Sequence, residues 1–227
     1  MLGVLVNVGA IICGGLLGLL LKKGLSDNIK KIVIQAIGLS TIVIGISSAI
    51  LTENVLLLVL SLVSGGVIGT LLKIDHNLER LGKSIEDRFA KNENGFAKGF
   101  VLATLIYCVG AMAIVGSIEA GVEGDNTTLY LKSILDGVTA IIFTASLGYG
   151  VIFSSVPVLV YQGTIVLLGN QLQSFLSDEM INEMSAVGGV LILAIGLNLL
   201  DIKKLNLGDL LPSIFIPIIY FLILTVI

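Results

Sequence analysis

Asp136 is an acid well inside an apolar segment of this chain. At 1.5 Å per residue it lies about 10 Å past the start of that segment. Lys132 lies one helical turn earlier, and this i,i+4 spacing lets the two side chains pair. Two interpretations stay open. The pair is a local ion pair at the membrane interface, or Asp136 binds a cation or proton, or anchors a substrate, together with Asn7 at a similar depth.

Other polar residues are spread along the apolar segments, and Gln162 is one of them. Each needs a hydrogen-bond partner where water is absent. A second group of candidates consists of residues that break helices. Ser64, Gly65 and Gly66 interrupt one apolar segment, and Pro217 interrupts another. They indicate either discontinuous helices that line a ligand site or glycines that serve close packing alone.

The composition that surrounds these residues is that of an integral membrane protein. The chain has 227 residues, of which 56% are hydrophobic and 13% charged, and its mean hydropathy is +1.06. A helix needs roughly 20 apolar residues to cross a bilayer core, and the alternation of a membrane barrel is absent. The sequence therefore predicts an all-α membrane protein of about eight spanning helices, at residues 2–21, 32–51, 54–72, 97–117, 129–153, 156–175, 185–200 and 209–226.

Charge predicts how these helices are oriented. Lysines and arginines gather between spans one and two, three and four, and seven and eight. The connections between spans two and three, four and five, and six and seven carry acids and no basic residue. The positive-inside rule then places both termini outside and the basic connections in the cytoplasm. The uncharged residues 137–177 form either two spans or one span with a re-entrant hairpin, and Ser154 to Pro157 supply the turn signal between two spans.

An offset of 151 residues reveals an internal repeat. Residues 16–46 align with 167–197 without a gap and with ten identical positions, including Leu-Ser-Asp at 25–27 and 176–178. The offset pairs span one with six, two with seven and three with eight, so the two copies run through the membrane in opposite directions. Under it Pro217 falls on Gly66. The serines of both tripeptides are expected to cap the helices that follow.

The repeat defines the predicted organisation of the chain. Residues 1–73 form repeat one, 74–95 an amphipathic linker helix at the cytoplasmic surface, 96–154 spans four and five, and 155–227 repeat two.

Several function classes lack support in the sequence. Motifs of zinc proteases, phosphate-binding loops and serine hydrolases are absent, and His76 is the single histidine. Cys13 and Cys108 are expected to pack as reduced, small apolar residues. The basic residues form no nucleic-acid face. We therefore expect no enzyme activity, catalytic residue, cofactor or metal site.

Several blocks of sequence resemble a bacterial membrane family, domain-of-unknown-function family 554 (DUF554). They are GVLVNVGAIICGGLLG (3–18), YCVGAMAIVGSIEAG (107–121), LYLKSILDGV (129–138), VYQG (160–163) and SAVGGVLILAIGLNLLDIKK (185–204). The resemblance covers nearly the whole chain. It implies a membrane or transport protein of the bacterial inner membrane, with Asn7, Lys132, Ser133, Asp136, Gly137 and Gln162 in its signature blocks.

Taken together, these features favour a secondary transporter or channel for a small solute or ion. Its site would lie near the membrane midplane where the repeats meet. Glycine-rich helix faces also indicate a homodimer within the lipid bilayer. The alternative is a structural or regulatory membrane protein that transports nothing and binds a partner through those faces.

Overall fold

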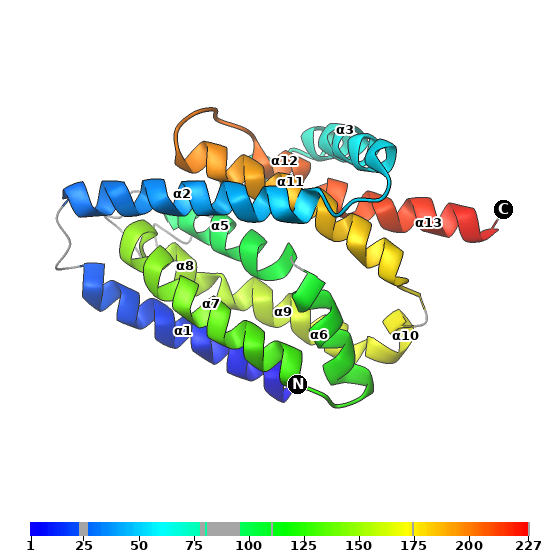
Figure 1. The fold of residues 1–227 in the computed structure, drawn as a ribbon, viewed down its shortest axis with the longest axis horizontal. Helices are drawn as coiled ribbons and strands as arrows, with labels where there is room; N and C mark the ends of the chain where they lie inside the picture. Colours follow the sequence, from blue (N-terminus) through cyan, green and yellow to red (C-terminus); the bar gives the residue numbers. More distant parts are fainter. Residues whose placement is uncertain (23–26, 78–79, 81–95, 110, 174, 227) are drawn as a thin grey trace. The chain divides into compact units, whose positions relative to one another are not determined.

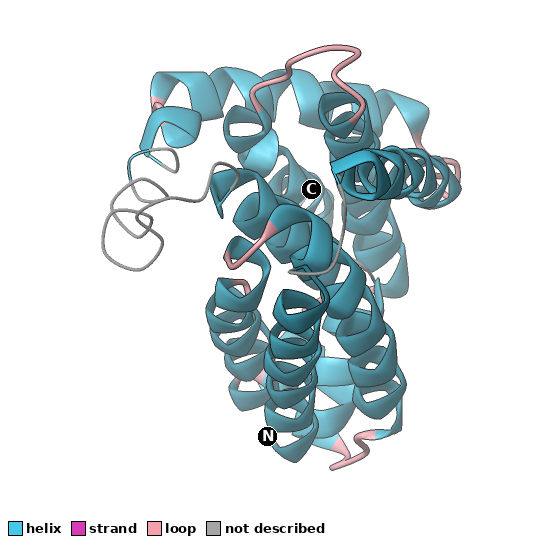
Figure 2. Ribbon diagram, turned by 90° about the vertical axis from the view of Figure 1, so that its left-hand side faces the viewer, coloured by secondary structure: helices cyan, strands magenta, loops and turns pink. Residues whose placement is uncertain are grey.

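A computed structural model describes residues 1–22, 27–77, 80, 96–109, 111–173 and 175–226. All regular secondary structure in these ranges is helical (Figures 1 and 2). The elements are α1 (Leu2–Lys22), α2 (Asp27–Ala49), α3 (Val55–Leu71), α5 (Phe96–Val109), α6 (Ala111–Val122), α7 (Thr127–Leu147), α8 (Gly150–Phe153), α9 (Ser155–Leu167), α10 (Gly169–Gln173), α11 (Asp178–Leu199), α12 (Leu207–Leu210), the 3₁₀ helix η1 (Leu211–Phe215) and α13 (Ile216–Val226).

Within the described ranges, six helical segments are long and apolar enough to cross a membrane. They are Leu2–Lys22, Lys31–Ala49, Thr127–Leu147, Gly150–Leu167, Asp178–Leu199 and Leu207–Leu224. Parts of α5 and α6 together form a seventh candidate, bent by 56°. α3 is apolar but has 17 residues, the lower limit for a spanning helix. The prediction of an all-α membrane protein is confirmed. The described ranges contain six candidate spans, or seven with the bent pair, where the sequence predicts about eight.

The chain folds as two compact units. Unit 1 consists of Met1–Ile34 and Gly82–Phe175, and unit 2 of Gln35–Leu81 and Leu176–Ile227. Each unit therefore combines segments that are far apart in the sequence. The predicted linker helix at 74–95 falls largely outside the described residues.

Unit 1 is built around a close contact between α1 and α7, which lie side by side in Figure 1. Gly14 faces the carbonyl oxygen of Gly137, and Gly18 faces that of Ile141. Later residues of α1 meet later residues of α7, so the two helices are parallel. Small residues let the two backbones approach each other, which is the usual basis of helix association in lipid.

The chain reverses direction after α7 at a glycine. Gly148 has a φ of 84°, a conformation that glycine adopts readily, and its N–H donates to the Thr144 carbonyl at 2.9 Å. The predicted turn at Ser154 to Pro157 is thus wrong in position, because α8 and α9 continue there as one segment suitable for a span. Pro157 lies in the first turn of α9, where its missing N–H costs nothing.

Unit 2 shows a reciprocal contact between α2 and α11. A Cβ atom added at Gly45 would lie 2.7 Å from the carbonyl oxygen of Gly189, and one added at Gly196 would lie 2.8 Å from that of Gly38. Under the offset of 151, Gly189 corresponds to Gly38 and Gly196 to Gly45. Contacts that exchange partners in this way are those of elements related by a twofold axis. The inverted repeat of the whole chain stays a prediction.

α3 is continuous through Ser64, Gly65 and Gly66, so the idea of a broken helix at these residues is corrected. A Cβ atom added at Gly65 would collide with the backbone of Ser213. This close packing leaves no room for a side chain at position 65 and so explains the glycine on structural grounds. In the second copy α12, the 3₁₀ helix η1 and α13 follow one another within the helical segment Leu207–Leu224, and Pro217 is the second residue of α13. The second copy thus changes helix type at η1, whereas α3 is a continuous α-helix.

The repeated Leu-Ser-Asp can be assessed in one copy. Ser177 precedes α11, and its hydroxyl oxygen accepts a hydrogen bond from the Met180 N–H at 3.2 Å. This confirms the predicted cap. The equivalent Ser26 lies outside the described residues, directly before α2.

The α1–α7 contact can be tested with two alanine substitutions in α1. Alanine is a better helix former than glycine by about 1 kcal/mol. At Gly9, where no atom lies within 4 Å of an added Cβ, we expect an unchanged or higher melting temperature of the purified protein. At Gly14 the added methyl would strike the Gly137 carbonyl, and overpacking of this kind costs about 1–3 kcal/mol. Equal melting temperatures of Gly9→Ala and Gly14→Ala would contradict the contact.

Candidate functional site

Four of the residues predicted to carry chemistry meet in unit 1. Lys132 Nζ donates to both carboxylate oxygens of Asp136, at 3.0 and 2.8 Å. Asn7 Nδ2 donates to Asp136 Oδ2 at 3.0 Å and to Gln162 Oε1 at 3.2 Å. The side chains come from α1, α7 and α9. We call these four residues the polar cluster.

Local structure explains why these side chains meet. Lys132 and Asp136 lie one turn apart on the buried face of α7. Beside Asp136, Gly137 has no side chain, and a Cβ atom added there would be 3.2 Å from Ala10 Cβ of α1. This approach brings Asn7, one turn before Ala10, against the carboxylate. Gln162 joins because α9 runs antiparallel to α1, as the residues that it contacts show.

The polar cluster is sealed from its surroundings. Asn7 and Gln162 have no exposed surface, and Lys132 and Asp136 are each 5% exposed. Removing two charges from water costs several kcal/mol per ion, and their attraction repays this only with good geometry and further hydrogen bonds. The two carboxylate contacts of Lys132 and the amide of Asn7 supply such bonds.

Tyr107 of α5 adds an aromatic wall that the sequence analysis did not single out. The Lys132 Nζ atom lies 5.9 Å from the centre of its ring, within range of a cation–π interaction. The Thr139 hydroxyl is 3.4 Å from the Tyr107 hydroxyl. Tyr107 lies in one of the blocks that resemble the family, but no charge or spacing distinguishes it from the other tyrosines.

Two atoms of the polar cluster have no hydrogen-bond partner. They are the acceptor Asn7 Oδ1 and the donor Gln162 Nε2, and both are buried. The amide nitrogen of Asn7 faces two acceptor oxygens, which fixes its orientation by chemistry. Buried polar atoms are nearly always paired, so an orphan acceptor and an orphan donor beside an ion pair need an explanation.

The remaining predicted candidates belong to unit 2 and not to this polar cluster. Ser64 Oγ donates to the Leu60 carbonyl of its own helix at 2.6 Å. Gly65 packs on Ser213, and an added Cβ at Gly66 would be 3.2 Å from a methyl of Leu210. Pro217 is buried at the start of α13. Their observed contacts are those of helix packing.

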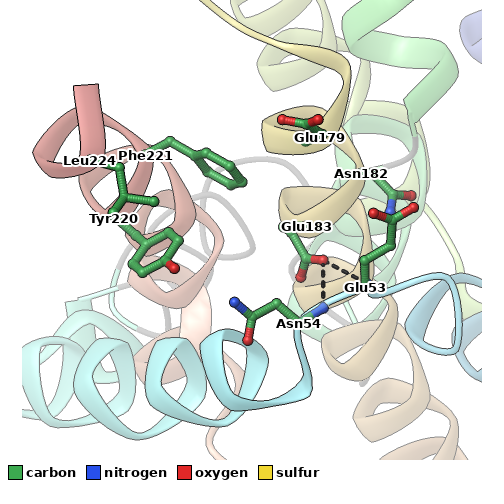
Figure 3. Close-up of a pocket in the computed structure, with 8 residues that line it drawn as sticks. All are labelled: Glu53, Asn54, Glu179, Asn182, Glu183, Tyr220, Phe221 and Leu224. Carbon is green, nitrogen blue, oxygen red and sulfur yellow. Dashed lines mark hydrogen bonds between the residues drawn. The ribbon is translucent and has the colours of Figure 1, made fainter.

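A pocket of about 200 Å³ lies elsewhere in unit 2 (Figure 3). It is lined by Glu53, Asn54, Glu179, Asn182, Glu183, Tyr220, Phe221 and Leu224, with no basic residue among them. Glu183 is 3% exposed and accepts from Thr52 Oγ1 at 2.6 Å, Glu53 N at 2.7 Å and Asn54 N at 3.1 Å. Its carboxylate therefore satisfies the backbone where α3 begins, which is a structural role.

The fold and the polar cluster together define a class. An all-helical chain with several spanning segments and an ion pair buried between them is a polytopic membrane protein. The chain matches the model of the family described as "Protein of unknown function (DUF554)" over residues 2–222, and it belongs to that family.

Two relatives have been named without an assigned function. The chain is 34% identical over 223 residues to "Uncharacterized membrane protein YdfK" of Bacillus subtilis (strain 168), covering 96% of this chain and 94% of that protein. It is 29% identical over 218 residues to "Uncharacterized protein YqgA" of Escherichia coli (strain K12), covering 94% and 93%. No solved structure matches the chain.

A double-mutant cycle tests the buried ion pair. Lys132→Met leaves a buried carboxylate without its cation, and breaking a buried pair costs about 3–5 kcal/mol. Adding Asp136→Leu removes the orphan charge, so the double variant should recover most of the lost stability. Melting temperatures of the two single variants and the double variant in detergent measure this coupling. Effects that simply add would contradict the pairing.

Proposed function

We propose that this protein is a secondary transporter or channel for a small solute or ion, and that the polar cluster is its binding site. The observation that carries this proposal is the Lys132–Asp136 pair, buried beside orphan atoms of Asn7 and Gln162. Ionisable residues within membrane helices are expensive, and where they occur they commonly mark ion pathways, proton relays or substrate sites.

Energetics support a functional reading of the pair. An apolar pair of similar volume in place of a buried ion pair is often neutral or stabilising. The α1–α7 contact already has glycines and apolar side chains to hold it together. The packing of α1 against α7 therefore does not require Lys132 and Asp136. A ligand that binds to their charges would explain why the two residues are present.

The reciprocal contact of unit 2 supports a transporter architecture. Inverted repeats are common in secondary transporters, whose sites lie near the midplane. We infer that spans one to three (α1–α3) and six to eight (α9–α13) are the inverted copies, and that both termini face outward in a bacterial inner membrane. The shallow groove on α3 lined by Val63, Gly66, Val67, Thr70 and Leu71 supports the proposed homodimer, because small residues let helices approach closely.

The central experiment replaces Asp136 by asparagine, which keeps the shape and removes the charge. A thermal-shift screen of ions and small metabolites on the purified protein first identifies a ligand, and uptake of that ligand into liposomes is then measured. We expect Asp136→Asn to abolish uptake while the protein still inserts and folds.

Asp125→Asn is the matched control, because Asp125 is an exposed acid close to the start of α7. Hydrogen bonds from the hydroxyl and backbone N–H of Thr127 lower the pKa of Asp125 below its usual value. Asparagine retains an acceptor for them, so the control should transport like the wild type. Unchanged uptake by Asp136→Asn would remove this residue from the transport site and contradict the proposal that the polar cluster binds the ligand.

A further inference from the structure

The described charges of the polar cluster sum to zero, and this restricts what can bind. Lys132 carries one positive charge and Asp136 one negative charge, and both are almost completely buried. A cation that joined them would leave an uncompensated positive charge in an apolar interior, which is strongly unfavourable. Binding therefore requires that another positive charge leave.

We propose that the polar cluster exchanges a monovalent metal cation for the proton of Lys132, which makes the protein an electroneutral cation/proton exchanger. This inference rests on the transport function proposed above. In the step, Lys132 Nζ loses one proton to water and becomes a neutral amine. The cation takes the place of the ammonium at the Asp136 carboxylate. One positive charge enters and one leaves, and no bond to carbon changes.

The oxygen atoms of the polar cluster suit such an ion. Asp136 Oδ1 and Oδ2 now accept from Lys132, and Gln162 Oε1 accepts from Asn7. Asn7 Oδ1 is buried and accepts from nothing, so it is an oxygen ligand already removed from water. Carboxylate and carbonyl oxygens are the ligands that hard cations prefer.

The unpaired donor of the polar cluster, Gln162 Nε2, also bears on the exchange. Gln162 Nε2 has no acceptor, and Lys132 offers none as an ammonium, because an ammonium has only donors. A neutral amine gains a lone pair, which can accept a hydrogen bond. The exchange therefore creates an acceptor on Lys132 as well as filling the free acceptor position of Asn7.

The helices that pack around the polar cluster carry other ionisable groups, and one of them, Glu119, is a carboxylate. On α5 they are Tyr107, whose ring faces Lys132, and Cys108. On α9 the neighbour of Gln162 is Tyr161. Neither α8 nor residues 2–12 of α1 contain a charged side chain or a cysteine. On α6, Glu119 accepts from Thr128 Oγ1 at 2.6 Å, one turn before Lys132.

The charge of the cation follows from the same inventory. The polar cluster contains one carboxylate, and in the described part of the chain no group of three or more His, Cys, Asp or Glu residues could hold a metal ion. A divalent ion would bring one charge more than Asp136 balances. A monovalent ion restores neutrality once a single proton has left.

Proton release measures the exchange directly. Purified wild-type protein in weakly buffered detergent solution receives NaCl, LiCl or KCl, with choline chloride as the control salt, and a pH dye reports released protons. We expect about one proton per cation bound for at least one of the three metal ions, because the two binding events are linked. Choline, a large organic cation, should release none.

Lys132→Arg is the decisive variant. Arginine keeps the positive charge beside Asp136 and so preserves the ion pair, but it does not lose its proton in proteins. We expect a normally folded protein whose cation-induced proton release and cation/proton exchange in liposomes are both lost.

The outcomes separate this inference from the proposed function. Proton release by wild type and its loss in Lys132→Arg support the exchange. Cation flux that requires Asp136 but continues in Lys132→Arg overturns the exchange and leaves the transporter standing, as does uptake of a solute with no proton release for any of the three ions. Flux that survives in Asp136→Asn overturns the exchange and also the assignment of the polar cluster as the binding site.

Discussion

The structure depends on how a lysine and a carboxylate are kept together away from water. Two charges in an apolar interior are tolerated only when they neutralise each other and when further hydrogen bonds satisfy their remaining donors and acceptors. Lys132 and Asp136 achieve this on a single helix at 2.8 and 3.0 Å. Asn7 supplies a further donor from α1, which ties the pair to the packing of unit 1.

Glycine is the means by which the packing reaches the charges. Side chains at Gly14 and Gly137 would hold α1 and α7 apart, and Asn7 would then not reach Asp136. The same principle holds in unit 2, where the glycines of α2 and α11 contact each other's helices reciprocally. Close backbone contact is thus common to both units, whereas the buried ion pair is specific to unit 1 among the described residues.

Much of the site could be predicted from the sequence because charge in an apolar segment is conspicuous. The spacing of Lys132 and Asp136 predicts their pairing, and Asn7 and Gln162 stand out as amides in otherwise apolar helices. Tyr107 could not be singled out, since a tyrosine gives no sign of which ring faces a lysine. Residue type and position within an apolar segment therefore predict the charged residues of such a cluster better than the aromatic residues that surround them.

The fold was predictable in kind and less so in detail. Apolar length predicts the helices, but the turn before α8 depends on the left-handed backbone of Gly148, and Ser154 to Pro157 gave the stronger sequence signal. Ser64 to Gly66 resemble a helix break, yet a helix tolerates such residues when a neighbour packs against them, as Ser213 does here. The buried role of Glu183 also depends on a tertiary contact with residues 52–54.

The central claim is that Asp136 is ionised and paired in the interior of the protein. Infrared difference spectroscopy between wild type and Asp136→Asn at neutral pH tests it most directly. We predict that the substitution removes a carboxylate band and no carboxylic-acid band. Loss of a protonated carboxylic-acid band instead would contradict the ion pair, and with it the site proposed for this protein.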